Sequence, residues 1–433
     1  MLNRFFKLQE NKTNVRTELS SGAITFFAMA YILVVNPAVL SSAGIPFDRV
    51  FTATIISIVL ATLIVAFGAN YPIVVAPAMG INSYFASMVG LWGVDYKTIL
   101  ATCLVAGLVF IFLSLTNLRE ELINAIPNNL RHGISVAIGL FITFIGFKNS
   151  GIIVANPATI LSLGKLGEPS VYLTILGVVL ILALIVLEVK GAIFIGMFIT
   201  AVISYFMGIL KIGEIFEMPN MDFSLLYNPI TEISNIFEVG LYGVVFAFLM
   251  VTLFDTTGTM MAVTSQAGLV KNNKIPKARF VFLADSIATT VGALLGTSPT
   301  SPYIESSSGV ANGGRTGLTA LTTAVLVFLS LFLAPLAAAL SSVPAITSPA
   351  LIIIGSFMME NVSKIEWDDI TESFPAFITI LGIPLTGSIN DGIAFGFIFY
   401  VILKVIKGKA KDIHPLMYIF SLLFLIQLIV MYK

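Results

Sequence analysis

The sequence predicts an all-α polytopic membrane protein with fourteen membrane-spanning segments, arranged as two inverted repeats of seven. Three observations predict this fold: a very apolar composition, long apolar stretches that recur along the chain, and an uneven distribution of Lys and Arg between alternate loops. Of the 433 residues, 57% are hydrophobic and 11% are charged, whereas soluble domains carry about 25% charged residues. So few charges cannot cover a soluble surface, so lipid must cover much of the chain.

The apolar stretches follow a polar N-terminus, which we expect to be retained because a cleavable signal peptide would have an earlier and shorter apolar region. Most are close to the length that crosses about 30 Å of hydrocarbon. We expect spans at 20–42, 50–69, 72–92, 97–115, 133–147, 171–188, 192–210, 239–264, 279–296, 298–313, 317–340, 349–360, 373–386 and 389–406. A last apolar run, 417–431, is either a further span or a helix lying against the bundle.

The distribution of basic residues tests this count. With a cytoplasmic N-terminus and alternating sides, 17 of the 23 Lys and Arg residues fall on the cytoplasmic side. Membrane proteins carry this excess in their cytoplasmic loops. A wrong number of crossings would scramble the bias, so the sequence favours fourteen spans.

The chain divides at its longest polar stretch, 211–238, which follows the seventh span. Because seven is odd, the second half enters the membrane in the opposite orientation to the first. We therefore expect a first repeat at 1–210, a polar connection at 211–238, a second repeat at 239–411 and an extra C-terminal apolar segment at 412–433. Inverted repeats of this kind are a recurring design of transporters.

The third span of each half is interrupted by proline, glycine and polar residues. Pro77, Pro299 and Pro302 resist helix and favour extended backbone before them. The sequence predicts short extended pieces at 73–77 and 298–303, each followed by a half-helix. The two pieces can pair with each other, which leaves both half-helix N-termini facing one cavity. The alternative is a pair of proline kinks in ordinary spanning helices.

Three carboxylates lie inside or beside predicted spans: Asp255, Asp285 and Glu305. A carboxylate at membrane depth is costly, so such residues usually face an interior cavity and carry a function. Each also has a purely structural interpretation. Asp255 and Asp285 can accept hydrogen bonds from neighbouring residues, and Glu305 can cap its own half-helix.

Weaker candidates lie beside these carboxylates. Asn82 aligns with Glu305 when the two half-helices are superimposed, and Tyr303 can stack on a planar ligand or pack against protein. The single cysteine, Cys103, excludes an internal disulfide, and two histidines make a metal site an unlikely interpretation. The zero net charge argues against a nucleic-acid partner. We find no phosphate-binding Gly-x-x-x-x-Gly-Lys motif and no constellation for an enzyme or a cofactor.

Three motifs resemble a known family. They are Ala76-Pro-Ala-Met-Gly-Ile-Asn-Ser-Tyr-Phe-Ala86, Phe254-Asp-Thr-Thr-Gly-Thr259 and Tyr303-Ile-Glu-Ser-Ser-Ser-Gly-Val-Ala-Asn-Gly-Gly-Arg-Thr-Gly317. They resemble the AzgA-like adenine/guanine/hypoxanthine permease branch of the nucleobase–cation symporter / nucleobase–ascorbate transporter superfamily, from about Thr17 to Lys411. One departure is the segment Ser298-Pro-Thr-Ser-Pro302, which is richer in proline than the family pattern.

The resemblance implies a plasma-membrane symporter that takes up a purine base with a proton, often as a homodimer. It implies a core domain of spans 1–4 and 8–11 and a gate domain of spans 5–7 and 12–14. By the matching positions, Asp255 and Glu305 contact the base and Asp285 supports them. We expect backbone amides to bind ring acceptors, Tyr303 to stack, and a carboxylate to carry the coupled proton. These amides lie around Ala78, Met79, Asn82, Tyr303 and Ile304.

Two other functions fit the same fold. An anion carrier or channel would have a basic or neutral site, and two acids within the spans argue against it. A nucleobase symporter driven by sodium would share the site and differ only in the coupling cation.

Overall fold

A computed structural model describes residues 2–116, 122, 125–219, 228–238, 241–270 and 275–431. The first part of the chain contains α1 (Leu2–Phe5), α2 (Val15–Met29), α3 (Ile32–Ser41), α4 (Phe47–Ile64), η1 (Val65–Ala69), β1 (Val75–Pro77), α5 (Met79–Trp92), α6 (Tyr96–Leu115), α8 (Asn128–Ser150), β2 (Ile153–Asn156), β3 (Ile160–Leu163), α9 (Pro169–Val186) and α10 (Ala192–Phe206). Two short helices, α11 (Asn228–Thr231) and α12 (Ile233–Glu238), follow.

The second part contains α13 (Tyr242–Gln266), α14 (Ala278–Leu295), β4 (Thr300–Pro302), α15 (Ser306–Ala311), α16 (Gly317–Leu329), η2 (Ser330–Leu333), α17 (Ala334–Ser341), α18 (Pro344–Met358), η3 (Met359–Lys364), α19 (Ile370–Thr386), α20 (Ile389–Ile406), η4 (Ala410–Asp412) and α21 (Pro415–Met431). Helical structure lies at every predicted span. In the described part of the chain, ten helices are long and apolar enough to cross a membrane, and three apolar helices are shorter.

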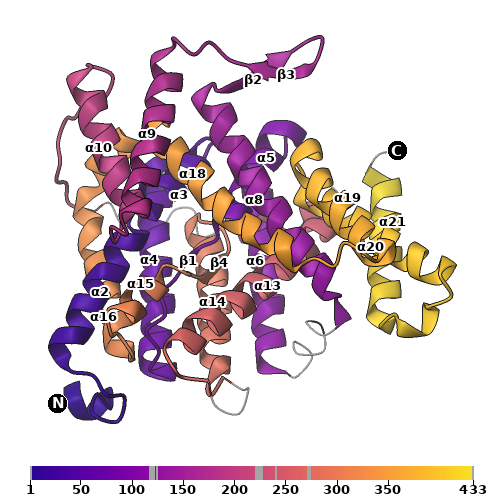
Figure 1. Cartoon of the computed structure of the whole chain (residues 1–433), viewed down its shortest axis with the longest axis horizontal. Coiled ribbons are helices and arrows are strands. Elements are labelled where there is room, and N and C mark those ends of the chain that lie inside the picture. The colour runs from indigo at the N-terminus through magenta and orange to yellow at the C-terminus, as the bar shows by residue number, and fades with distance from the viewer. Residues whose placement is uncertain are drawn as a thin grey trace.

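The helices pack mainly in two groups. One group contains α8, α9, α10, α18, α19 and α20, and the other contains α2, α3, α4, α6, α14, α15 and α16. Figure 1 shows β1 and β4 near the middle of the molecule, and the N-terminus on the opposite side from the β2–β3 hairpin. This hairpin, with Ile153 paired to Leu163, follows the fifth predicted span and was not expected from the sequence.

The two interrupted segments cross as a short antiparallel ladder. Val75 pairs with Pro302, Ala76 with Ser301 and Pro77 with Thr300. Two further backbone bonds extend the crossing: Ala78 N donates to Pro299 O at 2.9 Å, and Tyr303 N donates to Val74 O at 2.9 Å. The predicted pairing of the two extended pieces is confirmed. The extra proline fits this geometry because Pro299 contributes its carbonyl and needs no N–H.

The C-terminal apolar run forms a helix that packs against two others. Helix α21 packs on α20 and α13. Its Phe420 and Phe424 rings contact Phe246 of α13, with centroids 4.6 and 5.1 Å apart, and both also contact Phe397 of α20. This aromatic cluster holds the segment beside α13 and α20, a packing that fits both a further span and a helix lying against the bundle.

A buried carboxylate ties the segment after α15 to the N-terminal helix. Glu18, with none of its side chain exposed, accepts hydrogen bonds from the backbone N–H of Arg315 at 2.9 Å and of Thr319 at 3.1 Å. The hydroxyls of Thr316 and Thr319 add bonds of 2.8 and 2.6 Å. Arg315 lies two residues before α16, and Thr319 lies in its first turn, where N–H groups have no acceptor four residues earlier in the helix. The bond to α2 therefore holds the half-helix and α16 in one block.

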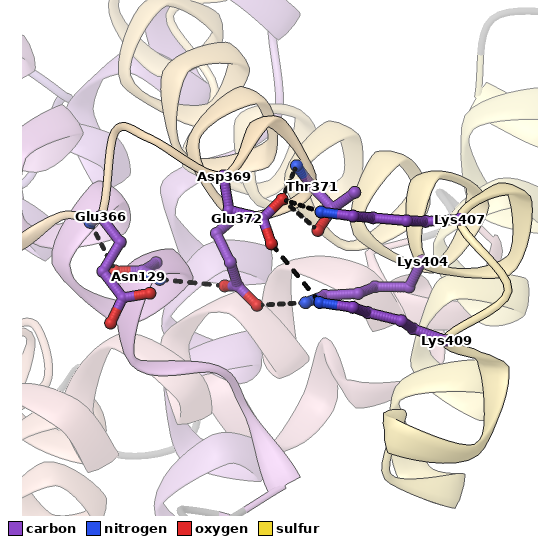
Figure 2. Close-up of polar contacts among 8 residues, drawn as sticks. All are labelled: Asn129, Glu366, Asp369, Thr371, Glu372, Lys404, Lys407 and Lys409. Atoms are coloured by element: carbon purple, nitrogen blue, oxygen red, sulfur yellow. Dashed lines mark hydrogen bonds and ion pairs between the residues drawn. The ribbon is translucent and has the colours of Figure 1, made fainter.

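A network of ion pairs and hydrogen bonds lies in the helix group that contains α8, α19 and α20 (Figure 2). Lys404 of α20 contacts Glu372 of α19 at 2.6 Å, with 8% and 15% of these side chains exposed. The second Glu372 oxygen accepts from the Asn129 amide of α8 at 3.0 Å. Nearby, the hydrogen bond from Lys407 at 2.8 Å holds the pKa of Asp369 well below its ordinary range. The network joins α8, α19 and α20.

Replacing Lys404 is expected to destabilise the protein. In Lys404→Met, Glu372 remains buried without its cation, a loss that costs about 3–5 kcal/mol in buried pairs. The melting temperature of the purified protein should fall by several degrees, and Lys404→Met combined with Glu372→Gln should recover part of the loss. Lys7→Met is the control, because its pair with Glu10 is exposed and contributes less than about 1 kcal/mol. Equal melting temperatures for both single variants would contradict the assignment.

Candidate functional site

A cavity of about 1140 Å³ lies between the two helix groups, next to the strand crossing. One wall comes from α5, α13, β4 and the start of α15, and the other from α8 and α18. The wall residues include Ala78, Met79, Asp255, Ser301, Tyr303, Ile304, Glu305, Ile138, Ile354 and Phe357. The cavity therefore contains six of the residues that the sequence singled out, together with apolar side chains from the opposite wall.

Asp255 lies on α13 and faces this cavity. Its carboxylate accepts a 2.5 Å hydrogen bond from the hydroxyl of Ser301, which is the middle residue of β4. Ser301 was not expected to take part. Within the described part of the chain, Ser301 is the hydrogen-bond donor to this carboxylate, so the strand positions the Asp255 side chain at the cavity.

Glu305 lies at the N-cap of α15 and faces the same cavity. It accepts a 2.5 Å hydrogen bond from the hydroxyl of Tyr31, which lies at the break between α2 and α3. Glu305 also interacts electrostatically with Asp255. Two carboxylates from different elements therefore share one cavity, and each holds one hydroxyl donor.

Tyr303 lies at the edge of the cavity, with its hydroxyl donating to Pro77 O at 2.6 Å. Its ring stacks on Tyr31, with centroids 6.5 Å apart and planes 28° apart. One face of Tyr303 is therefore already covered by protein. The ring locks the crossing between the two half-helices, and only part of it can meet a ligand.

Asp285 lies behind β4, fully buried in α14. Its carboxylate accepts from Thr300 at 2.8 Å and from Thr256 of α13 at 2.5 Å. Thr300 and Ser301 are neighbours on β4, so their side chains point to opposite faces of the strand. Asp285 thus binds one face of β4 through Thr300, while the other face presents Ser301 to Asp255. This placement suits the supporting position expected for Asp285.

The structure places Asn82 away from the cavity, contrary to the expectation that it contacts a ligand. The Asn82 side chain is fully buried. It donates to Asn36 Oδ1 at 2.5 Å and accepts from Ser298. Asn36 in turn donates to Thr54 at 2.6 Å. The alignment with Glu305 failed because Asn82 lies at the end of the first turn of α5 and points back towards α3, whereas Glu305 precedes its helix.

The half-helix ends contribute fewer backbone donors than expected. The amides of Ala78 and Tyr303 are already used in the strand crossing. The next three amides of α5, at Met79, Gly80 and Ile81, lie in the first helical turn and have no intrahelical acceptor. Ile304 also lines the cavity, and half of its surface is exposed. The remaining donors are thus concentrated at the start of α5.

Gly80 allows α8 to approach the start of α5 closely. A Cβ built on Gly80 would lie 2.2 Å from Ile138 Cγ2, a separation that real Cβ atoms do not adopt. The backbone of α5 at Gly80 therefore lies against the Ile138 side chain of α8, directly beside the cavity. Any side chain at position 80 would push the groups apart.

Exposed or half-buried polar residues line one part of the cavity, which we call its mouth. Asn128, Arg131 and His132 at the start of α8 line this mouth, together with Glu360, Asn361 and Lys364 of η3. On the opposite side of the site, Tyr84, Phe85 and Met88 of α5 are fully buried. There Ser87 donates to Gly387 O, between α19 and α20, at 2.9 Å. Among the described residues, polar side chains of α8 and η3 thus line the mouth. Buried side chains of α5 pack closely near Ser87.

Tyr31, Ser301 and Phe357 line the cavity and were missed by the sequence reasoning. A hydroxyl inside an apolar span was a usable signal for Tyr31, five residues before Asn36-Pro37. Ser301 lay inside the interrupted segment but was one of several hydroxyls there. Phe357 gave no signal, because an aromatic residue in an apolar span is ordinary.

A bundle of apolar helices around a largely apolar cavity that contains two carboxylates defines an integral multi-pass membrane transporter. The chain belongs to the permease family: residues 16–407 match the family described as "Permease family". It is 53% identical over 431 residues to guanine/hypoxanthine permease PbuO of Bacillus subtilis, covering 98% of this chain and 100% of that protein. It is 38% identical over 431 residues to adenine permease AdeP of Escherichia coli, covering 99% and 96%.

The fold also has a solved relative. The transmembrane domain of the cyanobacterial bicarbonate transporter BicA superimposes with a TM-score of 0.61 at 15% identity, covering 88% of this chain and 97% of that one. This likeness concerns the fold alone. The resemblance to the nucleobase–ascorbate transporter superfamily is confirmed by the family match and the curated relatives. The chain is a transporter and not an enzyme.

Cysteine labelling should distinguish the cavity wall from the polar cluster behind it. The natural Cys103 is fully buried, so the wild-type protein provides an unreactive background. Ile304→Cys should react rapidly with a water-soluble maleimide, whereas Asn82→Cys should not, because its side chain lies behind α5. The measurement is the labelling rate of folded protein in detergent or nanodiscs. Equal rates at positions 304 and 82 would contradict the placement of Asn82.

Proposed function

We propose that the protein takes up purine nucleobases of the hypoxanthine, guanine and adenine group by proton symport. The observation that carries this proposal is the pair of carboxylates, Asp255 and Glu305, in one cavity, each already holding one hydroxyl donor. A purine base presents several ring and exocyclic N–H groups. Two carboxylates suit such a ligand, because hydrogen bonds to charged acceptors are the stronger ones.

In this proposal the hydroxyls of Ser301 and Tyr31 occupy the positions that base N–H groups take on binding. A base would exchange these donors for its own, and the amides at Met79 to Ile81 would meet its ring nitrogens. The names of the relatives PbuO and AdeP, a guanine/hypoxanthine permease and an adenine permease, support this substrate class.

We further propose that the chain crosses the plasma membrane fourteen times with a cytoplasmic N-terminus. The bias of basic residues supports this orientation. It assigns Arg131 and Lys364 to the same cytoplasmic side, and both line the cavity mouth although they are far apart in sequence. The cavity would then face the cytoplasm, and the seal at Ser87 and Gly387 would close the outer side.

The two helix groups would act as the core and gate domains. The strand crossing, Asp255 and Glu305 belong to the proposed core, whereas α8 and α18 belong to the proposed gate. Movement of the gate past the core would open the outer side and close the mouth. Transporters with inverted repeats commonly alternate access in this way around a fixed site. Protonation of a site carboxylate would couple the cycle to the proton gradient.

The competing interpretation of an anion carrier has less support. The likeness to the bicarbonate transporter concerns the fold alone, and Asp255 and Glu305 would repel an anion from the site.

Neutralising either carboxylate should impair uptake. Asp255→Asn and Glu305→Gln each replace a charged acceptor, whose hydrogen bonds contribute about 1.5–3 kcal/mol, or roughly 10- to 100-fold in affinity. Radiolabelled hypoxanthine uptake into proteoliposomes measures the effect. Asp368→Asn and Glu366→Gln are matched controls outside the cavity and should transport normally. If both site variants keep saturable, pH-driven uptake, the site assignment is wrong.

The driving ion can be tested separately. In proteoliposomes, an inward proton gradient should drive hypoxanthine accumulation, and a protonophore should abolish it. A sodium gradient at equal pH should drive none. Accumulation that follows sodium and ignores pH would replace the proton with sodium and would leave the proposed substrate intact.

A further inference from the structure

The cavity mouth carries a group of cations that transport of a neutral base does not explain. Arg131 and His132 lie in the first turns of α8, and Lys364 ends η3. The His132 imidazole beside them is neutral at pH 7, so Arg131 and Lys364 supply the positive charge. The start of the 23-residue helix α8 adds the positive end of its dipole to the same place. Cations from two separate segments therefore converge on the route to the site.

Two acids near this mouth, Glu372 and Asp369, are bound to lysines outside the cavity. Figure 2 shows Glu372 bound to Lys404 and Asn129, and Asp369 bound to Lys407. Glu360 is the acid that lines the mouth itself. It pairs with Lys364 at 3.4 Å while 78% of its side chain is exposed, so water screens the pair. Arg131 contacts the neutral Asn128 amide oxygen. Among the described residues that line the cavity here, two cations, Arg131 and Lys364, accompany one acid, Glu360.

The same network also fixes the position of these cations. Asn129, the second residue of α8, donates to Glu372 at 3.0 Å, and its amide oxygen accepts from the backbone N–H of Glu366 at 3.0 Å. The first turn of α8 is therefore anchored on both sides. Arg131 and His132 extend into the mouth from a rigid helix end.

The distance from mouth to site suits a ligand longer than a base. Ile138 of α8 touches the start of α5 at Gly80, and Arg131 lies seven residues earlier on the same helix. At 1.5 Å per residue this places Arg131 about 10 Å along α8 from the site. A purine 5′-mononucleotide has its phosphate separated from the ring N–H groups by a similar span. The 1140 Å³ cavity exceeds the roughly 300–1,000 Å³ of pockets that hold drug-sized ligands, so a base alone fills little of it.

We propose that a purine 5′-mononucleotide binds this cavity from the mouth and inhibits the transporter. Its base would lie against Asp255 and Glu305, which rests on the proposed function, and its phosphate would contact Arg131, His132 and Lys364. A phosphate monoester carries about −1.5 to −2 charges at neutral pH, which the mouth cations complement. A ligand that touches α8, η3, α13 and α15 together spans both helix groups. It would prevent α8 from sliding past α5 and hold the mouth open.

Competition binding on the full-length protein in nanodiscs, where both faces are accessible, tests this inference. The probe is radiolabelled hypoxanthine, displaced by inosine 5′-monophosphate, inosine or inorganic phosphate. The monophosphate should displace the probe at concentrations at least about tenfold lower than inosine, since charge-assisted phosphate contacts are the strong ones. Inorganic phosphate alone should not displace it. A monophosphate no better than inosine would overturn the proposal.

Charge variants locate the effect. Arg131→Gln and Lys364→Gln should each weaken displacement by the monophosphate about tenfold and leave hypoxanthine and inosine unchanged, whereas Arg131→Lys should keep most of it. Lys411→Gln, which removes a cation outside the cavity, should change nothing. Unchanged displacement by the monophosphate in both Gln variants would overturn the phosphate site while purine binding stands. If the wild-type protein binds no hypoxanthine, the proposed function fails and this inference fails with it.

Discussion

Peptide groups that leave a helix inside a membrane need partners, because the surrounding hydrocarbon offers none. This constraint governs the centre of the molecule. Proline prevents helix at 77, 299 and 302, and the freed N–H and C=O groups of the two interrupted segments satisfy each other across the β1–β4 ladder. The ladder in turn fixes where α5 and α15 begin. Helix starts with free amides, and the carboxylate of Glu305, reach the cavity only because the strands cross there.

The carboxylates depend on the same ladder. Ser301 presents its hydroxyl to Asp255 from one face of β4, and Thr300 presents its hydroxyl to Asp285 from the other. Tyr303 closes the crossing by donating to the Pro77 carbonyl. Glu18 then holds the start of α16, immediately after the half-helix, against α2. Short polar contacts thus hold both the strand crossing beside the cavity and the start of α16 against α2.

The positions of the helices, the paired strands and the leading carboxylates were predictable from the sequence. Each has a local signal: an apolar run, a proline-rich break, or a charge at membrane depth. The placement of Asn82 and Phe357 was not predictable, whereas Tyr31 carried a usable signal as a hydroxyl inside an apolar span. Whether a polar residue faces a cavity or a buried neighbour depends on the rotation of its helix. Asn82 hydrogen-bonds Asn36 and Ser298, which lie in other segments. The β2–β3 hairpin was missed because four-residue strands outside an apolar span leave little pattern.

The alternation of side chains along β4 has an evolutionary consequence. Substitutions at 300 and 301 change one contact at a time, whereas inserting or deleting one residue between Pro299 and Tyr303 would exchange the two faces of the strand. Thr300 would then turn to the cavity and Ser301 to Asp285, and every later register position would shift with them. The length of this segment should therefore vary far less among descendants of this gene than its composition, so that new substrate preferences arise by substitution while the spacing stays constant.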